Sequence, residues 1–226
     1  MSLKIPIRAC AGELLGTALL LIAVVGSGIV AERLSSGNIG VALLLHSLAI
    51  GAALVVLIFI FAPVSGAHFN PLVTLAETWE GRFSKSLLPG YLIAQFFGAM
   101  LGVFATHAMF AMPLIQASAH VRTGMAQCFS EVIATFGLML LVLRRFSIPP
   151  SQVPWLIGAY ITAAIWFTSS FCFVNPTVTL ARAFTNTFCG IRREDVPGFA
   201  VAQIVGAIAA ILCSRFMGKQ EKQNVG

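Results

Sequence analysis

Long apolar stretches separated by short polar connections set the pattern of this chain. Six stretches approach the length of about 20 residues that a helix needs to cross a lipid bilayer. They cover residues 9–30, 40–61, 89–110, 124–143, 154–170 and 197–217. Two further apolar segments, between the second and third stretches and between the fifth and sixth, are interrupted by Pro and are too short to cross alone. The pattern therefore predicts an all-α membrane protein with six transmembrane helices and two re-entrant segments.

The two short segments carry the same motif. HFNPLVTLAE (68–77) returns as FVNPTVTLAR (173–182). Asn is a preferred helix N-cap and Pro suits the first helical position, so each Asn-Pro pair starts a helix. About ten helical residues extend roughly 15 Å, which is half a bilayer. The sequence thus predicts two re-entrant half-helices, and the motif residues are Asn70, Pro71, Leu72, Asn175, Pro176 and Thr177.

The duplication extends beyond this motif. PGYLIAQFFGAMLG (89–102) matches PGFAVAQIVGAIAA (197–210), and RACAGELLGTALL (8–20) matches AQCFSEVIATFGL (126–138) more weakly. Each copy contains three full crossings, an odd number, so the second copy must enter the membrane upside-down. We expect one domain over residues 1–226, built from inverted repeats at about 8–110 and 124–217.

Composition strengthens the membrane prediction. Mean hydropathy is +0.92, 58% of the residues are hydrophobic and 10% are charged, so bilayer lipid must cover the surface. The net charge of +6 comes from basic residues placed singly or in pairs between the spans, which indicates topology signals and excludes a nucleic-acid patch. The more basic side carries both termini and is expected to be cytoplasmic, in a plasma (inner) membrane. Its cations are Lys4, Arg8, Arg82, Lys85, Arg144, Arg145, Arg215, Lys219 and Lys222.

Inverted symmetry brings the two half-helix starts together near the bilayer midplane. Two positive dipole ends of about half a charge each would oppose a cation by on the order of 4 kcal/mol at about 4 Å and an effective dielectric near 20. The side-chain amides of Asn70 and Asn175 can still donate hydrogen bonds to a neutral solute. No nucleophile elbow, phosphate loop or metal-ligand spacing occurs, and the five Cys form no CxxC pair, so we expect no enzyme activity, cofactor or metal site.

The paired Asn-Pro motifs, the SGAHFNP lead-in (65–71), a Glu at the start of each repeat and the AQ..GA blocks resemble the aquaporin (major intrinsic protein) family. The resemblance covers nearly the whole chain. It implies an α-helical channel with one pore per subunit, usually assembled as a homotetramer.

The chain departs from the family at its motifs. The usual NPA is NPL at Leu72 and NPT at Thr177, and Val178 stands where water- and glycerol-conducting members generally have Arg. Arg182, one turn beyond Val178, is either a substitute for that Arg or an ordinary ion-pair or headgroup contact.

By the family's spacing, the remaining selectivity-filter positions are Ile50, Ala163 and Cys172, which with Val178 give a wide apolar filter. Such a filter favours small uncharged solutes bulkier than water, and the pattern resembles channels of bacterial arsenic resistance that carry arsenous acid. We therefore expect a passive, aquaglyceroporin-like channel for arsenite or glycerol-like solutes as well as water. A water-selective aquaporin is the alternative.

Four polar residues within the apolar sequence leave alternatives open. Glu13 and Glu131 occupy matched positions, and they either anchor the loops before the half-helices or couple protons in a secondary transporter. His68 either lines the pore or anchors its loop. His46 has no recognisable partner in the sequence and is expected to be a packing or interface residue.

Overall fold

A computed structural model describes the backbone of residues 7–224 and the side chains of residues 7–218, so Lys4, Lys219, Lys222 and the ends of the expected domain lie outside the described residues. The described chain is helical and contains no strand. Its α-helices are α1 (Ile7–Leu34), α2 (Ile39–Ser65), α3 (Pro71–Trp79), α4 (Leu88–Met109), α5 (Met125–Arg144), α6 (Val153–Phe167), α7 (Pro176–Ala181) and α8 (Val196–Asn224). Three short 3₁₀ turns, η1 (Arg145–Ser147), η2 (Arg182–Phe184) and η3 (Arg193–Asp195), follow α5, follow α7 and precede α8.

Five segments are long and apolar enough to cross a membrane: Ile7–Leu34, Ile39–Ser65, Leu88–Met109, Met125–Ser147 and Arg193–Gly218. These confirm five of the expected crossings. The sixth, expected at 154–170, is α6, an apolar helix of 15 residues. It extends only about 22 Å as a helix. It ends early because Thr168 takes an extended backbone conformation that leads toward the second Asn-Pro pair.

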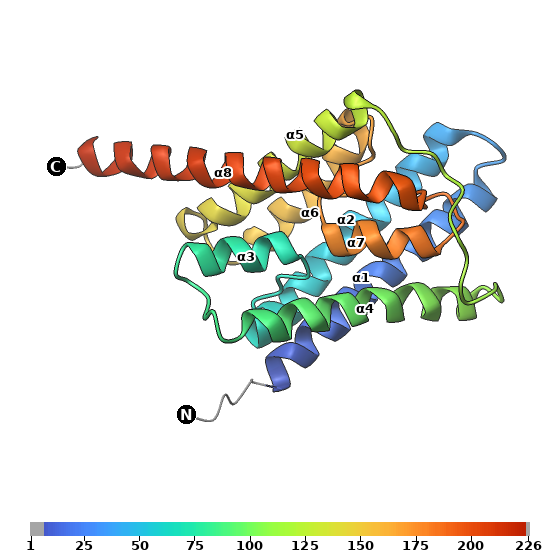
Figure 1. The fold of residues 1–226 in the computed structure, drawn as a ribbon, viewed down its shortest axis with the longest axis horizontal. Helices are drawn as coiled ribbons and strands as arrows, with labels where there is room; N and C mark the ends of the chain where they lie inside the picture. The colour runs from blue at the N-terminus through green and yellow to red at the C-terminus, as the bar shows by residue number, and fades with distance from the viewer. Residues whose placement is uncertain (1–6, 225–226) are drawn as a thin grey trace.

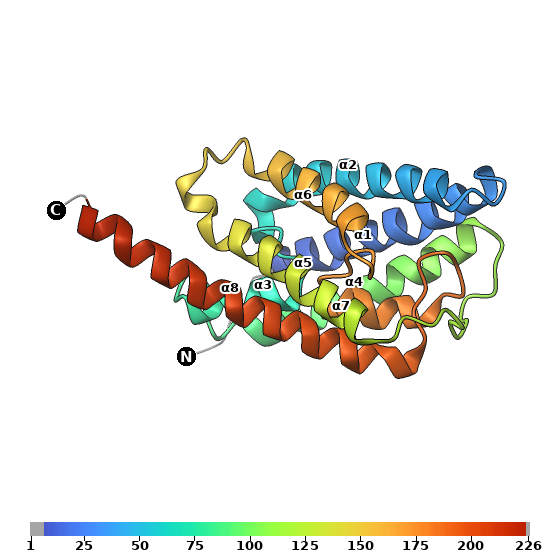
Figure 2. The ribbon, with the colours of Figure 1, turned by 90° about the horizontal axis from the view of Figure 1, so that it is seen from above.

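The helices pack in pairs, and the pairing of α1 with α4 in the first half matches that of α5 with α8 in the second. α1 packs along α4 and α5 packs along α8, while α2 runs beside both α1 and α6 (Figures 1 and 2). Matched glycines permit the close approach in each half. A Cβ added at Gly98 would lie 2.3 Å from the Leu14 carbonyl oxygen, and one at Gly206 would lie 2.4 Å from that of Val132. Such contact between small residues and a facing backbone is how helices associate in lipid.

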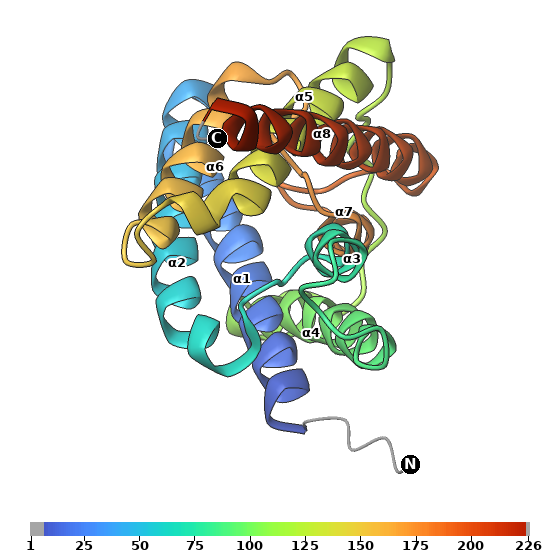
Figure 3. The same ribbon diagram turned by 90° about the vertical axis from the view of Figure 1, so that its left-hand side faces the viewer.

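The two half-helices lie end to end within this bundle. Figure 1 places α3 and α7 in line along the bundle axis, and Figure 3, which looks along that axis, superimposes them. α1 begins and α8 ends toward the same side, which we call the terminal end. The connections at residues 110–124 and 185–192 lie at the opposite side, the loop end (Figure 1).

Candidate functional site

Both half-helices start at their Asn-Pro pairs. The Asn70 side-chain oxygen accepts a hydrogen bond from the Leu72 backbone N–H at 2.9 Å, and that of Asn175 accepts from Thr177 N–H at 3.1 Å. Both Asn residues have extended backbones, and a Pro follows at the first helical position. The Asn-Pro sequence thus produces a local helix start in the middle of the bundle.

The two helix starts are tied to each other through the same Asn side chains. The Asn70 amide nitrogen donates to the Val174 carbonyl at 2.9 Å, and the Asn175 amide nitrogen donates to the Phe69 carbonyl at 2.7 Å. An Asn amide carries two N–H donors, so each side chain retains one for another partner. Both side chains are buried and also line the cavity described below.

The backbone leading into each half-helix takes a conformation that L-residues rarely adopt. Ala67 and Phe69 have φ values of 52° and 50°, and Cys172 and Val174 have 56° and 49°. Each such residue costs of order 1–3 kcal/mol and persists only where surrounding contacts hold it. The equivalent positions in both halves share this strain, which indicates that the same device holds both loops.

In the first half that device is Glu13, which is fully buried. Its Oε1 accepts hydrogen bonds from Ser65 Oγ at 2.7 Å and His68 N–H at 3.0 Å. Its Oε2 accepts from Phe69 N–H at 2.7 Å and Gln95 Nε2 at 2.8 Å. The carboxylate therefore fixes the irregular backbone between α2 and α3.

Glu131 does the same in the second half. Its Oε1 accepts from Ser170 Oγ at 2.6 Å and Phe173 N–H at 2.8 Å. Its Oε2 accepts from Val174 N–H at 2.9 Å and Gln203 Nε2 at 2.7 Å. In both halves the carboxylate thus accepts hydrogen bonds from the loop before the half-helix, and neither Glu13 nor Glu131 is among the cavity-lining residues.

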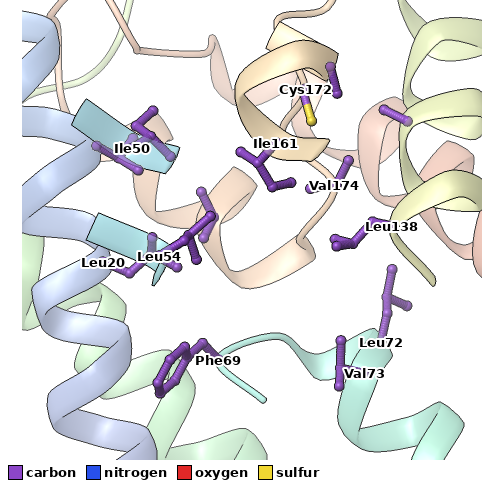
Figure 4. Packing of buried hydrophobic residues seen from close by; sticks show 14 of the residues in the cluster. Leu20, Ile50, Leu54, Phe69, Leu72, Val73, Leu138, Ile161, Cys172 and Val174 are labelled. Atoms are coloured by element: carbon purple, nitrogen blue, oxygen red, sulfur yellow. The ribbon is translucent and has the colours of Figure 1, made fainter. Parts of the chain in front are cut away.

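A cavity of about 370 Å³ runs past both helix starts. Toward the terminal end it is bordered by Arg145, Phe146 and Ile148, and toward the loop end by His46 and Arg182. Between them its wall is mostly apolar. Figure 4 shows part of that wall, with Leu20, Ile50, Leu54, Leu138, Ile161 and Val174 projecting around a common space. The Asn70 and Asn175 side chains are therefore polar points along an otherwise apolar passage.

Three of the four expected filter residues, Ile50, Cys172 and Val178, line this cavity. The placement of Ala163 is wrong, because Ala163 lies on the exposed face of α6 whereas Ile161 and Ile165 line the cavity. Two residues along an α-helix turn the side chain by roughly 200°, to the opposite face. The irregular segment at 168–174 separates α6 from the Asn anchor, so counting back from Asn175 did not fix the rotation of the helix.

His68 combines both roles that the sequence left open. His68 is among the cavity-lining residues, and its Nδ1 hydrogen-bonds Thr74 Oγ1 at 3.1 Å. Its backbone N–H is one of the donors to Glu13. Leu72 and Thr177, which replace the usual Ala of the motif, are buried but do not line the cavity. They therefore pack behind the Asn residues.

His46 and Arg182 were not among the expected filter residues, yet both line the cavity at its loop end. His46 lies one helical turn before Ile50, and Arg182 lies one turn after Val178. The sequence had already indicated Arg182 as a possible substitute for the missing Arg, and the same one-turn spacing, applied to Ile50, is the signal that would have found His46. His46, expected to be a packing or interface residue, packs against Phe188 and also lines the cavity.

No group of three or more His, Cys, Asp or Glu side chains that could hold a metal ion occurs within the described part of the chain.

The two half-helices meet start to start beside a cavity, and helices of membrane-spanning length surround them. This arrangement defines a membrane channel built from an inverted repeat. The comparisons with known proteins agree. Residues 2–172 match the model of the family described as "Major intrinsic protein". This chain belongs to that family, the aquaporin family.

Its relatives include aquaglyceroporins. The chain is 49% identical to aquaglyceroporin AqpS of Rhizobium meliloti over 210 residues, which cover 93% of this chain and 90% of that one. It is 31% identical to human aquaporin-9 over 202 residues, covering 76% and 68% of the two chains. The X-ray structure of the aquaglyceroporin from Plasmodium falciparum shares the fold, with a TM-score of 0.70 at 22% identity and coverage of 93% and 94%.

Proposed function

We propose that this multi-pass membrane protein is a passive channel for small uncharged solutes, with a filter wide enough for glycerol-like solutes and arsenous acid as well as water. The observation that carries the proposal is the apolar wall at the filter. Ile50, Cys172 and Val178 line it together with Ile165, and none of these side chains carries a charge. A wall with few hydrogen-bond donors admits bulkier neutral molecules and does little to hold a single file of water.

Selection against charge fits the same geometry. The two half-helix starts present their positive dipole ends to the cavity, and each Asn retains one amide N–H for a solute oxygen. A polyol or a neutral trihydroxide offers such oxygens along its length. The half-helix starts therefore supply hydrogen bonds in the middle of the passage and at the same time oppose cations.

The relatives support the solute class. The chain covers most of AqpS of Rhizobium meliloti, whose name describes an aquaglyceroporin, and human aquaporin-9 belongs to the same set of relatives. We extend that class to this chain and propose arsenous acid as one of its solutes. Passage of such solutes needs no covalent step and no cofactor.

The coupled-transporter alternative loses its main support. Glu13 and Glu131 each accept four hydrogen bonds, including two from backbone N–H groups, and neither faces the cavity. A proton-coupling carboxylate has to release those partners at every cycle. Their arrangement favours a fixed structural role.

For the cellular setting, we infer a plasma (inner) membrane location with both termini cytoplasmic, from the excess of basic residues on the terminal side. We also propose a homotetramer of single-domain subunits spanning residues 1–226, built from the inverted repeats 8–110 and 124–217. Large apolar side chains exposed on α2, α4 and α8, such as Phe59, Phe97 and Leu212, suit contact with lipid or with neighbouring subunits.

The test is the concentration dependence of glycerol entry into proteoliposomes, followed by stopped-flow light scattering with and without a proton gradient. We expect a flux that rises linearly with glycerol concentration and does not respond to the gradient. A saturable flux driven by the gradient would replace the channel with a coupled transporter.

A further inference from the structure

The apolar filter of this channel leaves open which group excludes cations beyond the half-helix starts. Arg182 is 4% exposed and is itself part of the cavity wall at the loop end. It begins η2, directly after α7, one turn farther from Asn175 than Val178. The cation missing at Val178 is therefore present about 5 to 6 Å farther along the same passage.

The Arg182 guanidinium is fixed by two contacts, but only one of its nitrogens donates a hydrogen bond within the described part of the protein. Its Cζ lies 3.4 Å from the centroid of the Phe173 ring, and its Nε donates to the Cys189 carbonyl. Among the described residues, neither terminal nitrogen has a hydrogen-bond acceptor and no carboxylate lies in ion-pair range. These terminal nitrogens are not among the enclosed, unpartnered atoms, so they keep accessible surface, and Arg182 lines the cavity.

A neighbouring arginine shows what a purely structural role looks like here. Arg122 uses its Nε to bind the Gly190 carbonyl at 2.6 Å and a terminal nitrogen to bind the Phe188 carbonyl at 3.1 Å. It does not line the cavity. Arg122 fixes the loop at residues 185–190, whereas Arg182 lines the cavity and has terminal donors without an acceptor among the described residues.

His46 completes a polar level at the same end. It is buried, lines the cavity and hydrogen-bonds Ser27 through Nδ1 at 2.8 Å. Its Nε2 has no partner in the part of the chain that the structure describes. The ring packs edge-on against Phe188, next in sequence to the Cys189 carbonyl that holds Arg182, so both side chains meet at one short segment.

We propose that His46 and Arg182 form a second, polar constriction one helical turn beyond the apolar filter, and that Arg182 is the group that excludes cations there. This inference rests on the proposed channel function and assigns its charge selectivity. The apolar filter sets solute size, and the displaced Arg182 offers a fork of N–H donors to solute oxygens while it repels cations. Because the apolar filter and the polar constriction lie at different depths, the channel can admit bulky neutral solutes at the first and exclude cations at the second.

The test uses proteoliposomes loaded with a pH-sensitive dye, in which proton entry is driven by a K⁺ diffusion potential and glycerol flux is measured in the same preparation. Arg182→Gln is expected to raise proton leak by on the order of tenfold to a hundredfold, as expected for removing one unit charge several ångströms from the ion path. Arg182→Lys keeps the charge and is expected to stay tight. Arg193→Gln, at an exposed Arg on η3, is the matched control and is expected to behave as wild type.

A double variant separates selectivity from folding. Adding Val178→Arg to Arg182→Gln restores a cation one turn away, so proton exclusion is expected to return while glycerol flux falls. The inference is overturned if Arg182→Gln conducts glycerol normally and stays as tight as Arg193→Gln, or if the double variant leaks as much as the single one. Wild-type glycerol flux reports on the proposed function separately, because that flux is independent of which residue excludes cations.

Discussion

Replacing Glu131 with glutamine puts an amide NH₂ group where one carboxylate oxygen now accepts hydrogen bonds. Each oxygen of Glu131 accepts two donors, and at least one of each pair is a backbone N–H of the strained loop. The side chains of Ser170 and Gln203 can turn to accept from the new amide, but whichever way it turns, one buried backbone N–H loses its acceptor. Such a loss costs about 1–3 kcal/mol, so Glu131→Gln is expected to destabilise the fold by about that amount.

The assay is thermal unfolding of the purified protein in detergent, followed by the loss of the folded peak in size-exclusion chromatography. Glu13→Gln is expected to cause a similar loss, because Glu13 holds the matched loop through the same four kinds of contact. Glu32→Gln, at an exposed position near the end of α1, is the control and is expected to leave stability unchanged. The loop-anchoring role would be refuted if the Glu131→Gln variant unfolds at the wild-type temperature and yet no longer transports glycerol. That result would favour proton coupling instead.

Three further predictions concern the passage and its frame. Val178→Arg is expected to lower glycerol and arsenous acid permeability at least about tenfold while sparing water, since it puts a long charged side chain into the filter; equal loss of water flux in stopped-flow assays would contradict this. Ile165→Trp should block glycerol flux because Ile165 lines the cavity, whereas Ala163→Trp on the exposed face of α6 should not; the reverse result would show that α6 is rotated. Gly206→Leu would press a side chain against the Val132 carbonyl and is expected to cost about 3 kcal/mol or more, lowering the unfolding temperature; no change would mean that α5 and α8 are not so close.

The half-helices could be predicted because their signals are local and occur twice. Asn and Pro at 70–71 and 175–176 define helix starts from the chemistry of two adjacent residues. The matched positions of Glu13 and Glu131 then left loop anchoring as one of two interpretations, and the structure shows the hydrogen bonds that loop anchoring requires.

The cavity wall was harder to predict because it depends on how helices are rotated about their axes. α6 is apolar around most of its circumference, so its sequence does not distinguish Ala163, on the exposed face, from Ile165, in the wall. The roles of His46 and Arg182 depend on their contacts with Phe188 and Cys189. For His46, this segment is far away in the sequence. Such contacts arise only when the bundle is assembled.

The central claim, a wide channel for neutral solutes, is tested most directly by the permeabilities of water, glycerol and arsenous acid in one proteoliposome preparation. Stopped-flow light scattering would follow water and glycerol, and arsenic content of the vesicles would follow arsenous acid. The account predicts rapid passage of all three, each well above protein-free vesicles. Passage of water alone would contradict it and would show that the polar level at His46 and Arg182, and not the apolar filter, sets the size limit.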